Sequence, residues 1–577
     1  MEVENQVNTI DVCQVTPYFD SSESATELSL PLTFSDIIWL RFHPVERIFF
    51  YKLTESTPSF FNSVILPKLK HSLSHTLLHF LPLAGNLIWP PQAIKPIILY
   101  TPDDGVQLTI AESTADFHLL SGNEVHGAAD SRPYIPELPV TDSKASAIAL
   151  KITLFPNHGF CIGMSAHHAV LDGKSSTMFI KAWAHLCKLG DEDKRQYPAL
   201  LTELTPVFDR IAIQDPEGLD MVYLNNWLEL KWPGVDLNPR SLQLLPAIAV
   251  GSSSVRATFE LSREDIKKLR ERVLANLVKE GSKETRPIHL STFVLVLAHG
   301  FVCIAKARGF ESNRRVLIGF AVDCRARLDP PIHENYFGNC VSSCAAFTEA
   351  ESLLEENGFM HVAEMLSELI KNLEKGSVLD GAKETAASFM KEAAGGAALL
   401  GVAGSNRFEV YGTDFGWGKP EKVEITSIDR TGAISLAESK DGNGGVEIGF
   451  VLEKHEMEKF TSLFIMNCRS LEEFWSFYVT QHSKPSTRRW HFVGTLSIIL
   501  LLLSSFVFNL WFLFLVPLVG YGFSWYSHFI VEGNVPATFG HPVWSFLCDC
   551  KMFGLMLTGQ MDREIKRLGK RPILQGF

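Results

Sequence analysis

The chain has 577 residues, of which 46% are hydrophobic and 20% charged, so it is globular and long enough for two or three domains. Its net charge of −12 argues against the basic footprint that a nucleic-acid partner requires. The ten cysteines show neither a C-x-x-C pair nor metal-finger spacing, which fits free thiols in a reducing compartment. The acidic, polar residues 1–5 predict no signal or transit peptide.

The first half of the chain opens with short apolar runs and then shows a helical pattern over residues 64–78. His71, His75 and His79 lie four residues apart along it and imitate a metal-binding face. We interpret them as a polar helix face, because a zinc site needs a further ligand and supporting hydrogen bonds. Two strands follow, at residues 149–155 and 160–164, joined by a turn at residues 157–159.

The return strand leads into residues 165–173, after which apolar residues trace one helix face, with Ser175 as the expected N-cap. Residues 189–216 are polar and without a period, so we expect them to connect two halves of an enzyme. The second half alternates helices and strands. We expect helices at 262–279, 293–307 and 455–464, strands at 255–261, 317–323, 423–426, 433–438 and 446–452, and loops at 395–396 and 401–406.

The composition changes at about residue 471, and residues 492–530 contain no charged residue over 39 positions. A single span needs about 20 apolar residues, so this length predicts two membrane helices, about 492–508 and 510–530, with Asn509 at the turn. A buried pair of core helices is the alternative. Basic residues flank both ends, which places both ends in the cytosol by the positive-inside rule.

Residues 165–173 (SAHHAVLDG) form the first candidate site, because His168 and Asp172 make an H-x-x-x-D spacing between a strand and a helix. A histidine at the end of a buried strand can act as a general base near neutral pH, and the Asp can hold the loop. Alone the spacing is weak, since a core histidine beside a helix-capping Asp gives the same pattern. A second motif downstream, DFGWGKP at residues 414–420, favours a functional site over a core histidine with a helix-capping Asp.

Three further motifs complete the pattern: residues 79–86 (HFLPLAGN), 323–328 (DCRARL) and 336–340 (YFGNC). In this order, over about residues 8–465, the five motifs resemble the BAHD family of coenzyme A-dependent acyltransferases. The resemblance implies an α/β fold of two domains with mixed sheets, similar to chloramphenicol acetyltransferase. It implies a tunnel with His168 at its middle, and no cofactor for acyl transfer, because the acyl-CoA is a co-substrate.

The resemblance also implies roles for single residues. His168 is the base that takes the proton of the acceptor hydroxyl. Asp172 pairs with Arg325 and holds the loop rather than relaying protons. Trp417 is our candidate for the N–H donor that stabilises the oxyanion, while Asp414 braces its own loop, with a role in proton transfer as the lower-ranked alternative.

Other residues are candidates for holding the acyl donor. Ser291 and Thr292 start a helix whose N–H groups can bind coenzyme A phosphates, although an ordinary helix cap is equally compatible. The YFGNC motif and residues 427–433 resemble the versions in anthocyanin and flavonoid glucoside malonyltransferases. A malonyl carboxylate needs a cation, for which Arg430 and Lys174 are candidates; either can equally be a solvated surface charge.

The tail has its own resemblance, carried by FWSFY, HSKP, GYG and HFIVE within residues 474–532. These stretches are similar to a small membrane family that includes an iron-dependent 2-hydroxy fatty acid dioxygenase. His482, His491 and His528 match histidine positions of that pattern, and three imidazoles can bind Fe(II). A bare membrane anchor with interfacial histidines is an equally good interpretation.

The sequence therefore predicts acyltransferase domains at residues 1–205 and 206–465 and a membrane hairpin domain at 471–577. We expect a monomeric cytosolic enzyme, anchored to the endoplasmic reticulum, that moves malonyl from malonyl-CoA to a sugar 6-hydroxyl of a phenolic or flavonoid glucoside. The alternatives are another acyl donor, a dioxygenase tail with the rest as a passenger, a membrane-tethered scaffold with an inactive acyltransferase part, and a gene model that joins two neighbouring genes near residue 470.

Overall fold

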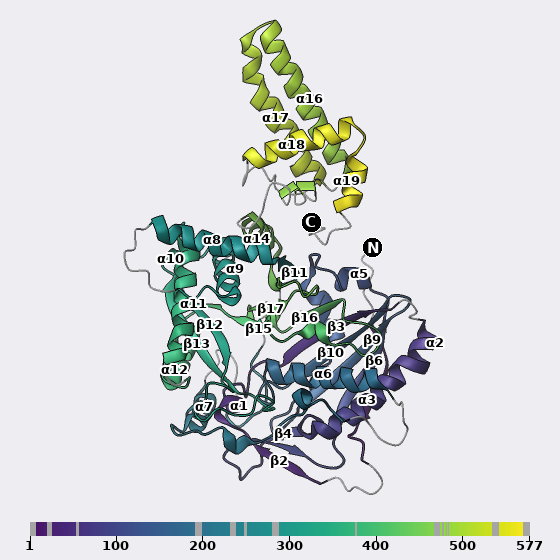
Figure 1. The fold of residues 1–577 in the computed structure, drawn as a ribbon, viewed down its shortest axis with the longest axis vertical. Coiled ribbons are helices and arrows are strands. Elements are labelled where there is room, and N and C mark those ends of the chain that lie inside the picture. Colours follow the sequence, from purple (N-terminus) through teal and green to yellow (C-terminus); the bar gives the residue numbers. More distant parts are fainter. Residues whose placement is uncertain are drawn as a thin grey trace. The chain divides into compact units, whose positions relative to one another are not determined.

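The computed structural model resolves two compact units, one of Met1–Gly122 with His126–Lys454 and one of Asn123–Val125 with His455–Phe577. The structure describes residues 7–19, 26–53, 57–190, 199–230, 238–246, 251–279, 288–375, 378–466, 474–475, 478–479, 482, 484–532 and 542–568. The first unit contains sheets with helices packed against them (Figure 1), so the predicted α/β class with mixed sheets is confirmed.

A six-stranded mixed sheet forms the first half of this unit. Its order is β1 (Val7–Val15), β6 (Val106–Ser113), β9 (Ile148–Phe155), β10 (Gly159–Ala166), β3 (Val45–Lys52) and β16 (Lys422–Ile425). Only β6 and β9 are parallel; the other neighbours are antiparallel. The predicted hairpin of β9 and β10 is present, and β10 is buried along its whole length, as expected of an apolar central strand.

Two helices pack side by side in this half of the unit, α3 (Leu66–His79) and α6 (Gly173–Leu189) (Figure 1). The indole N–H of Trp183 on α6 donates to the Leu69 carbonyl of α3 at 3.2 Å and ties the two helices together. The N-cap of α6 is Asp172, whose side chain accepts the backbone N–H of Ser175. The prediction that Ser175 is the cap is therefore wrong; it lies in the first turn.

The remaining strands form three smaller sheets. One contains β15 (Val402–Gly404), β17 (Ile434–Glu438), β18 (Val446–Glu453), β11 (Ser254–Leu261) and β7 (His126–Gly127). Another contains β13 (Val341–Glu349), β12 (Arg315–Asp323) and β14 (Ala398–Leu400), and the last β2 (Leu28–Pro31), β5 (Ile97–Tyr100), β4 (Asn86–Ile88) and β8 (Lys144–Ser146). The loop predicted at 401–406 is wrong in part, because β15 pairs in parallel with β17 there.

Two strands are exchanged between the early and late parts of the chain. The late strand β16 pairs with β3 in the first sheet, and the early strand β7 pairs with β11 in the second. Helices surround these sheets, namely α1 (Phe34–Ile37), α7 (Leu219–Glu229), α8 (Arg263–Lys279), α9 (Thr292–Arg308), α10 (Ala350–Leu354), α11 (Gly358–Lys375) and α12 (Ala382–Ala394). The predicted boundary at residue 205 stays a prediction.

The second unit is helical. It contains α16 (Pro485–Val507), a 3-10 turn (Leu510–Phe514), α17 (Leu515–Tyr526), a π-helical turn (Ser527–Glu532), α18 (Pro542–Leu557) and α19 (Met561–Leu568). The chain reverses at Asn509, as expected, and its side chain accepts the Trp511 N–H. Two segments, Pro485–Val507 and Leu510–Glu532, are long and apolar enough to cross a membrane by length and composition.

Candidate active site

The central strand β10 and helix α6 position the H-x-x-x-D loop. The strand ends at Ala166, and the next side chain, His167, is completely buried. Its Nδ1 accepts the backbone N–H of Ala169 at 3.2 Å, which turns the chain at this point. His168 follows this buried anchor and is only partly buried, so it is the more exposed histidine of the pair.

The imidazole of His168 stacks on the indole of Trp39, with ring centroids 4.2 Å apart and an interplanar angle of 11°. Its own carbonyl accepts the side-chain N–H of Asn339 at 2.8 Å. Burial lowers the pKa of His168 to about 4, although the charge of Asp172 acts in the opposite direction. The imidazole is therefore neutral at pH 7, which is the form that can accept a proton.

Asp172 uses both carboxylate oxygens within the loop. Oδ1 accepts the Ser175 N–H at 2.8 Å, and Oδ2 accepts Nη2 of Arg325 at 2.9 Å and the Cys340 N–H at 3.2 Å. The carboxylate and guanidinium are both almost completely buried. The structure thus brings Asp172 and Arg325 together, and their contacts hold the loop to β12 and the YFGNC motif.

Arg325 is the centre of these contacts. Its Nη1 donates to Asp323 at 2.9 Å, and its Nη2 donates to the carbonyls of Tyr336 at 3.0 Å and Gly338 at 3.2 Å. Burial acts to lower the pKa of Arg325, but the charges of Asp172 and Asp323 outweigh it and raise the pKa above its usual value. Arg325 is therefore a permanently charged brace.

A second buried network holds His168 from the other side, and the sequence did not reveal it. The Asn339 amide that holds His168 also donates to Asp36 at 3.1 Å, and Asp36 accepts Nη1 of Arg210 at 3.0 Å. Arg210 in turn donates to the Tyr336 hydroxyl at 2.7 Å. Asp36 and Asn339 lie 303 positions apart, and no spacing rule within one sequence connects them.

The DFGWG motif lies at the other end of α6. Asp414 accepts Nζ of Lys188 at 2.6 Å and the N–H groups of Gly416 and Gly418, so it braces its own loop. The ring of Trp417 packs against Phe160, at the start of β10. Since α6 is about 22 Å long between its first turn and Lys188, the structure does not bring Trp417 to His168. Its predicted contact with the reacting oxygen is not supported by this geometry.

The two candidate cations both have carboxylate partners. Arg430 Nη2 lies 3.2 Å from Oε1 of Glu46, and Lys174 Nζ lies 3.5 Å from Asp323. Glu46 pairs in register with Ser165, near the end of the strand that carries His168. Burial and the charges of Arg430 and Arg132 lower the pKa of His43 to about 4. Arg430 and Arg132 both pair with Glu46 here, so cations and a buried carboxylate lie together beside this strand end.

The other predicted residues of the first unit occupy local positions. Ser291 is the N-cap of α9, and its Oγ accepts the Val294 N–H at 3.3 Å, so the ordinary cap is present. Thr292 is the first residue of that helix, and its contact with a phosphate stays a prediction. His75 is buried, and its ring is tilted against that of Tyr18 with centroids 4.3 Å apart, so the expected polar helix face does not extend to His75.

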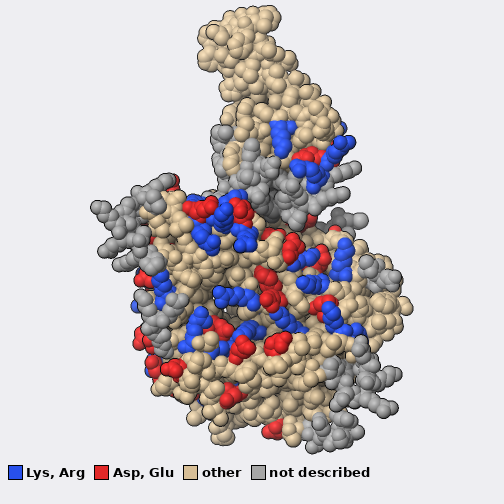
Figure 2. Space-filling view, in the orientation of Figure 1, with Lys and Arg blue, Asp and Glu red and all other residues tan. Residues whose placement is uncertain are grey.

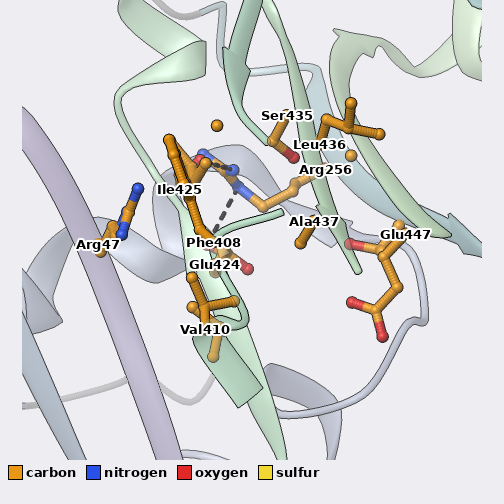
Figure 3. A pocket seen from close by; sticks show the side chains of 14 residues that line it. Arg47, Arg256, Phe408, Val410, Glu424, Ile425, Ser435, Leu436, Ala437 and Glu447 are labelled. Carbon is orange, nitrogen blue, oxygen red and sulfur yellow. Dashed lines mark hydrogen bonds and ion pairs between the residues drawn. The ribbon is translucent and has the colours of Figure 1, made fainter. Parts of the chain in front are cut away.

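A small cavity lies between the first two sheets (Figure 3). Charged side chains from both sheets surround it, including Arg47, Arg256, Glu424 and Glu447. Its volume is about 20 Å³, which is room for about one water molecule. His168 is not among its lining residues, so this cavity does not open onto the imidazole that we expect to be the base.

The three histidines of the tail come together in the second unit. His482, His491 and His528 are buried, and their ligand nitrogens lie within 4.8 Å of one another. His528 lies in the π-helical turn, a distortion that is frequent at functional sites. Nε2 of His482 lies 3.1 Å from Nε2 of His491. The Nδ1 atoms of both rings face acceptors, the Tyr478 carbonyl at 2.6 Å and Asp549 at 2.7 Å.

These contacts determine what the cluster can hold. If each Nδ1 carries its proton toward its acceptor, the two Nε2 lone pairs face each other. Lone pairs at this separation repel unless a proton or a cation lies between them. A shared proton would leave a charged imidazolium in a buried place, which is costly, whereas a divalent metal ion uses all three imidazoles as ligands. The residues present therefore fit a metal ion.

Comparison with known proteins agrees with both parts of this description. Residues 6–465 match the family model described as the Transferase family, and residues 468–561 match one described as 2-hydroxy-palmitic acid dioxygenase Mpo1-like. The chain belongs to the Transferase, or BAHD, family of acyl-CoA-dependent acyltransferases. Both resemblances predicted from the motifs are confirmed.

Individual relatives come from the same family. Phenolic glucoside malonyltransferase 1 of Arabidopsis thaliana is 47% identical over 80% of this chain and 98% of its own length. The anthocyanidin 5-O-glucoside-6''-O-malonyltransferase of that plant is 45% identical (79% and 97%), and its agmatine coumaroyltransferase is 40% identical (79% and 98%). Vinorine synthase shares the fold, with a TM-score of 0.54 and 20% identity over 79% of this chain and 96% of its own.

Replacing Arg325 with Met should destabilise the acyltransferase unit, because the Asp172 carboxylate would stay buried without its cation. We expect the free energy of unfolding to fall by about 3–5 kcal/mol, measured by urea denaturation with tryptophan fluorescence. Arg327→Met is the matched control, since Arg327 is exposed and donates only to a backbone carbonyl. Equal unfolding midpoints for the two variants would contradict the bracing role of Arg325.

Proposed function

We propose that the chain transfers malonyl from malonyl-CoA to a hydroxyl, with the sugar 6-hydroxyl preferred, of a phenolic or flavonoid glucoside. The observation that carries this proposal is the neutral, partly exposed imidazole of His168 at the end of β10, held on both sides by buried networks. The substrate class comes from the malonyltransferases to which the chain is 45–47% identical.

The proposed reaction needs one base. Neutral His168 accepts the proton of the acceptor hydroxyl while the hydroxyl oxygen attacks the thioester carbon, and the C=O electron pair moves onto oxygen. When the C=O bond re-forms, the C–S bond breaks, and the imidazolium returns the proton to the departing thiolate. Asp172 takes no part in this transfer, because both of its oxygens are occupied by Arg325, Ser175 and Cys340.

The malonyl carboxylate needs a cation, and Arg430 is the better of the two candidates. It is held by Glu46, whose backbone lies beside the strand end that carries His168. Its Nε is buried and has no hydrogen-bond acceptor among the described atoms. Lys174 remains the alternative, in the first turn of α6. The coumaroyltransferase among the relatives shows why a different acyl donor must also be assayed.

The second unit supports a second function, iron-dependent oxidation of a 2-hydroxy fatty acid. The buried cluster of His482, His491 and His528 favours it, since these residues would hold Fe(II). A bound iron would supply oxygen activation there, which no side chain of this unit can do. The family description of residues 468–561 points to the same substrate class.

We also propose that α16 and α17 anchor the chain in a membrane, with both ends of the hairpin in the cytosol. Large apolar side chains at the turn are strongly exposed, with Phe506 at 85%, Phe508 at 78% and Trp511 at 72%. Figure 2 shows an uncharged outer hairpin, with the charged side chains of this unit near its other end. We further propose that this membrane is the endoplasmic reticulum and that the chain is monomeric. A transcript that spans residue 470 would exclude a gene model that joins two separate genes.

His168→Ala should abolish most of the transfer, because general-base catalysis contributes about 10²- to 10⁴-fold. The assay uses the purified full chain in detergent, with malonyl-CoA, acetyl-CoA and a panel of phenolic glucosides, and mass detection of the ester. His158→Ala, in the exposed turn before β10, is the control and should keep the parent rate. A His168→Ala enzyme as fast as the parent would rule out the assigned base.

Arg430→Gln should reduce the preference for malonyl-CoA over acetyl-CoA by about 10- to 100-fold in kcat/KM, the range expected for one charged hydrogen bond. Glu46 keeps its ion pair with Arg132 in this variant, so the local structure around Glu46 should be unchanged. Lys174→Gln in the same assay separates the two candidates. An unchanged ratio in Arg430→Gln would remove Arg430 as the carboxylate partner.

The purified full chain should contain about one bound divalent metal ion per molecule, measured by mass spectrometry of the elements, and should consume oxygen with a 2-hydroxy fatty acid. His491→Ala should lose both properties because one of three ligands is gone. His455→Ala, an exposed histidine, serves as the control. Equal metal content in the parent and His491→Ala would show that the cluster is not the metal site.

A further inference from the structure

One carboxylate reaches the histidine cluster from outside it. Asp549 lies on α18 (Pro542–Leu557), far along the chain from His482 and His491. Its Oδ1 accepts Nδ1–H of His491 at 2.7 Å and also the hydroxyl of Tyr478 at 2.5 Å. Asp549 belongs to none of the sequence motifs, and Tyr478 entered only as the last residue of the FWSFY stretch, without a role.

Tyr478 connects two of the three imidazoles. Its backbone carbonyl accepts Nδ1–H of His482 at 2.6 Å, and its hydroxyl donates to the carboxylate that holds His491. Its ring also stacks on His482, with centroids 4.1 Å apart. The planes and tautomers of both histidines are therefore set from one residue, and each Nε2 is directed to the space that they share with His528.

We propose that Asp549 is the positioning residue of this cluster: its carboxylate fixes His491 as the Nδ1–H tautomer and makes Nε2 a stronger donor to a divalent metal ion. The inference rests on the proposed metal site. A carboxylate partner does more than a carbonyl, because its negative charge partly offsets the charge of the metal and increases the electron donation of the ring. With three neutral imidazoles alone, the double positive charge of a bound metal ion would be buried without any negative charge near it.

Direct ligation by Asp549 is disfavoured by the same geometry. Its bound oxygen lies on the Nδ1 side of the His491 ring, opposite Nε2. A metal ion at a normal bond length from Nε2 would be roughly 7 Å from that oxygen. A purely structural role, in which Asp549 only attaches α18 to Tyr478, makes a different prediction and can be separated by experiment.

The test measures Co(II) binding to the metal-free full chain in detergent, by titration and by the visible absorption of the bound ion. Asp549→Ala should weaken Co(II) binding by about 10- to 100-fold and alter the absorption spectrum. Asp549→Asn keeps the size and a hydrogen-bond acceptor but loses the charge, and should lie between Ala and the parent. Tyr478→Phe, which keeps the His491–Asp549 contact, should weaken binding less than Asp549→Ala.

Acyltransferase activity and circular dichroism report whether each variant folds, since Asp549 takes no part in the first unit's chemistry. If folded Asp549→Ala and Asp549→Asn bound Co(II) with the parent's affinity and spectrum, the positioning role would be wrong while the metal site stood. If His491→Ala bound Co(II) as tightly as the parent, the metal site itself would fall, and the positioning role with it.

Discussion

The buried ion pair of Asp172 and Arg325 is the interaction on which the acyltransferase unit depends. It joins the loop after the central strand to the end of β12 and to the YFGNC motif, segments that lie 153 positions or more apart in the chain. A buried charge is tolerable only with a well-placed partner. Here Arg325 also donates hydrogen bonds to the carbonyls of Tyr336 and Gly338. These contacts together hold the loop that positions His168.

The same arrangement explains why the imidazole of His168 is neutral rather than charged at pH 7. His167 fills the interior, Trp39 covers one face of the His168 ring, and Asn339 holds its carbonyl. This partial removal from water is what depresses the pKa, and the distant negative charge of Asp172 does not reverse it. The lowered pKa of His168 thus follows from packing around the loop more than from the motif spacing itself.

How much could be read from the sequence differs from element to element. The β9–β10 hairpin and α6 followed from apolar periodicity, and the turn at Asn509 from the length of the uncharged run. The pairing of Asp172 with Arg325 came only from the family resemblance. Asp36 and Asp549 were not found, and Asn339 stood in the YFGNC motif without an assigned role, because their contacts are long-range and no spacing within the sequence shows them. Trp417 was expected near His168 from the family resemblance, but the order of motifs along a chain says nothing about the distance between them. In the structure the length of α6 separates the two residues.

The two units place different chemistry in one chain. The first belongs to the acyl-CoA-dependent acyltransferases, whereas the second gathers three buried imidazoles whose ligand nitrogens lie within 4.8 Å of one another. The histidine cluster and the exposed apolar turn occupy different parts of the same helical hairpin.

The pH dependence of kcat/KM for malonyl transfer tests the central claim most directly. Because the pKa of His168 is lowered to about 4, the base is present above that value and is lost as the pH falls through it. We expect kcat/KM for malonyl transfer to stay level from pH 8 down to about pH 6 and to decline only in more acidic solution. A decline centred at pH 6.5 or above, with a stable enzyme, would contradict it.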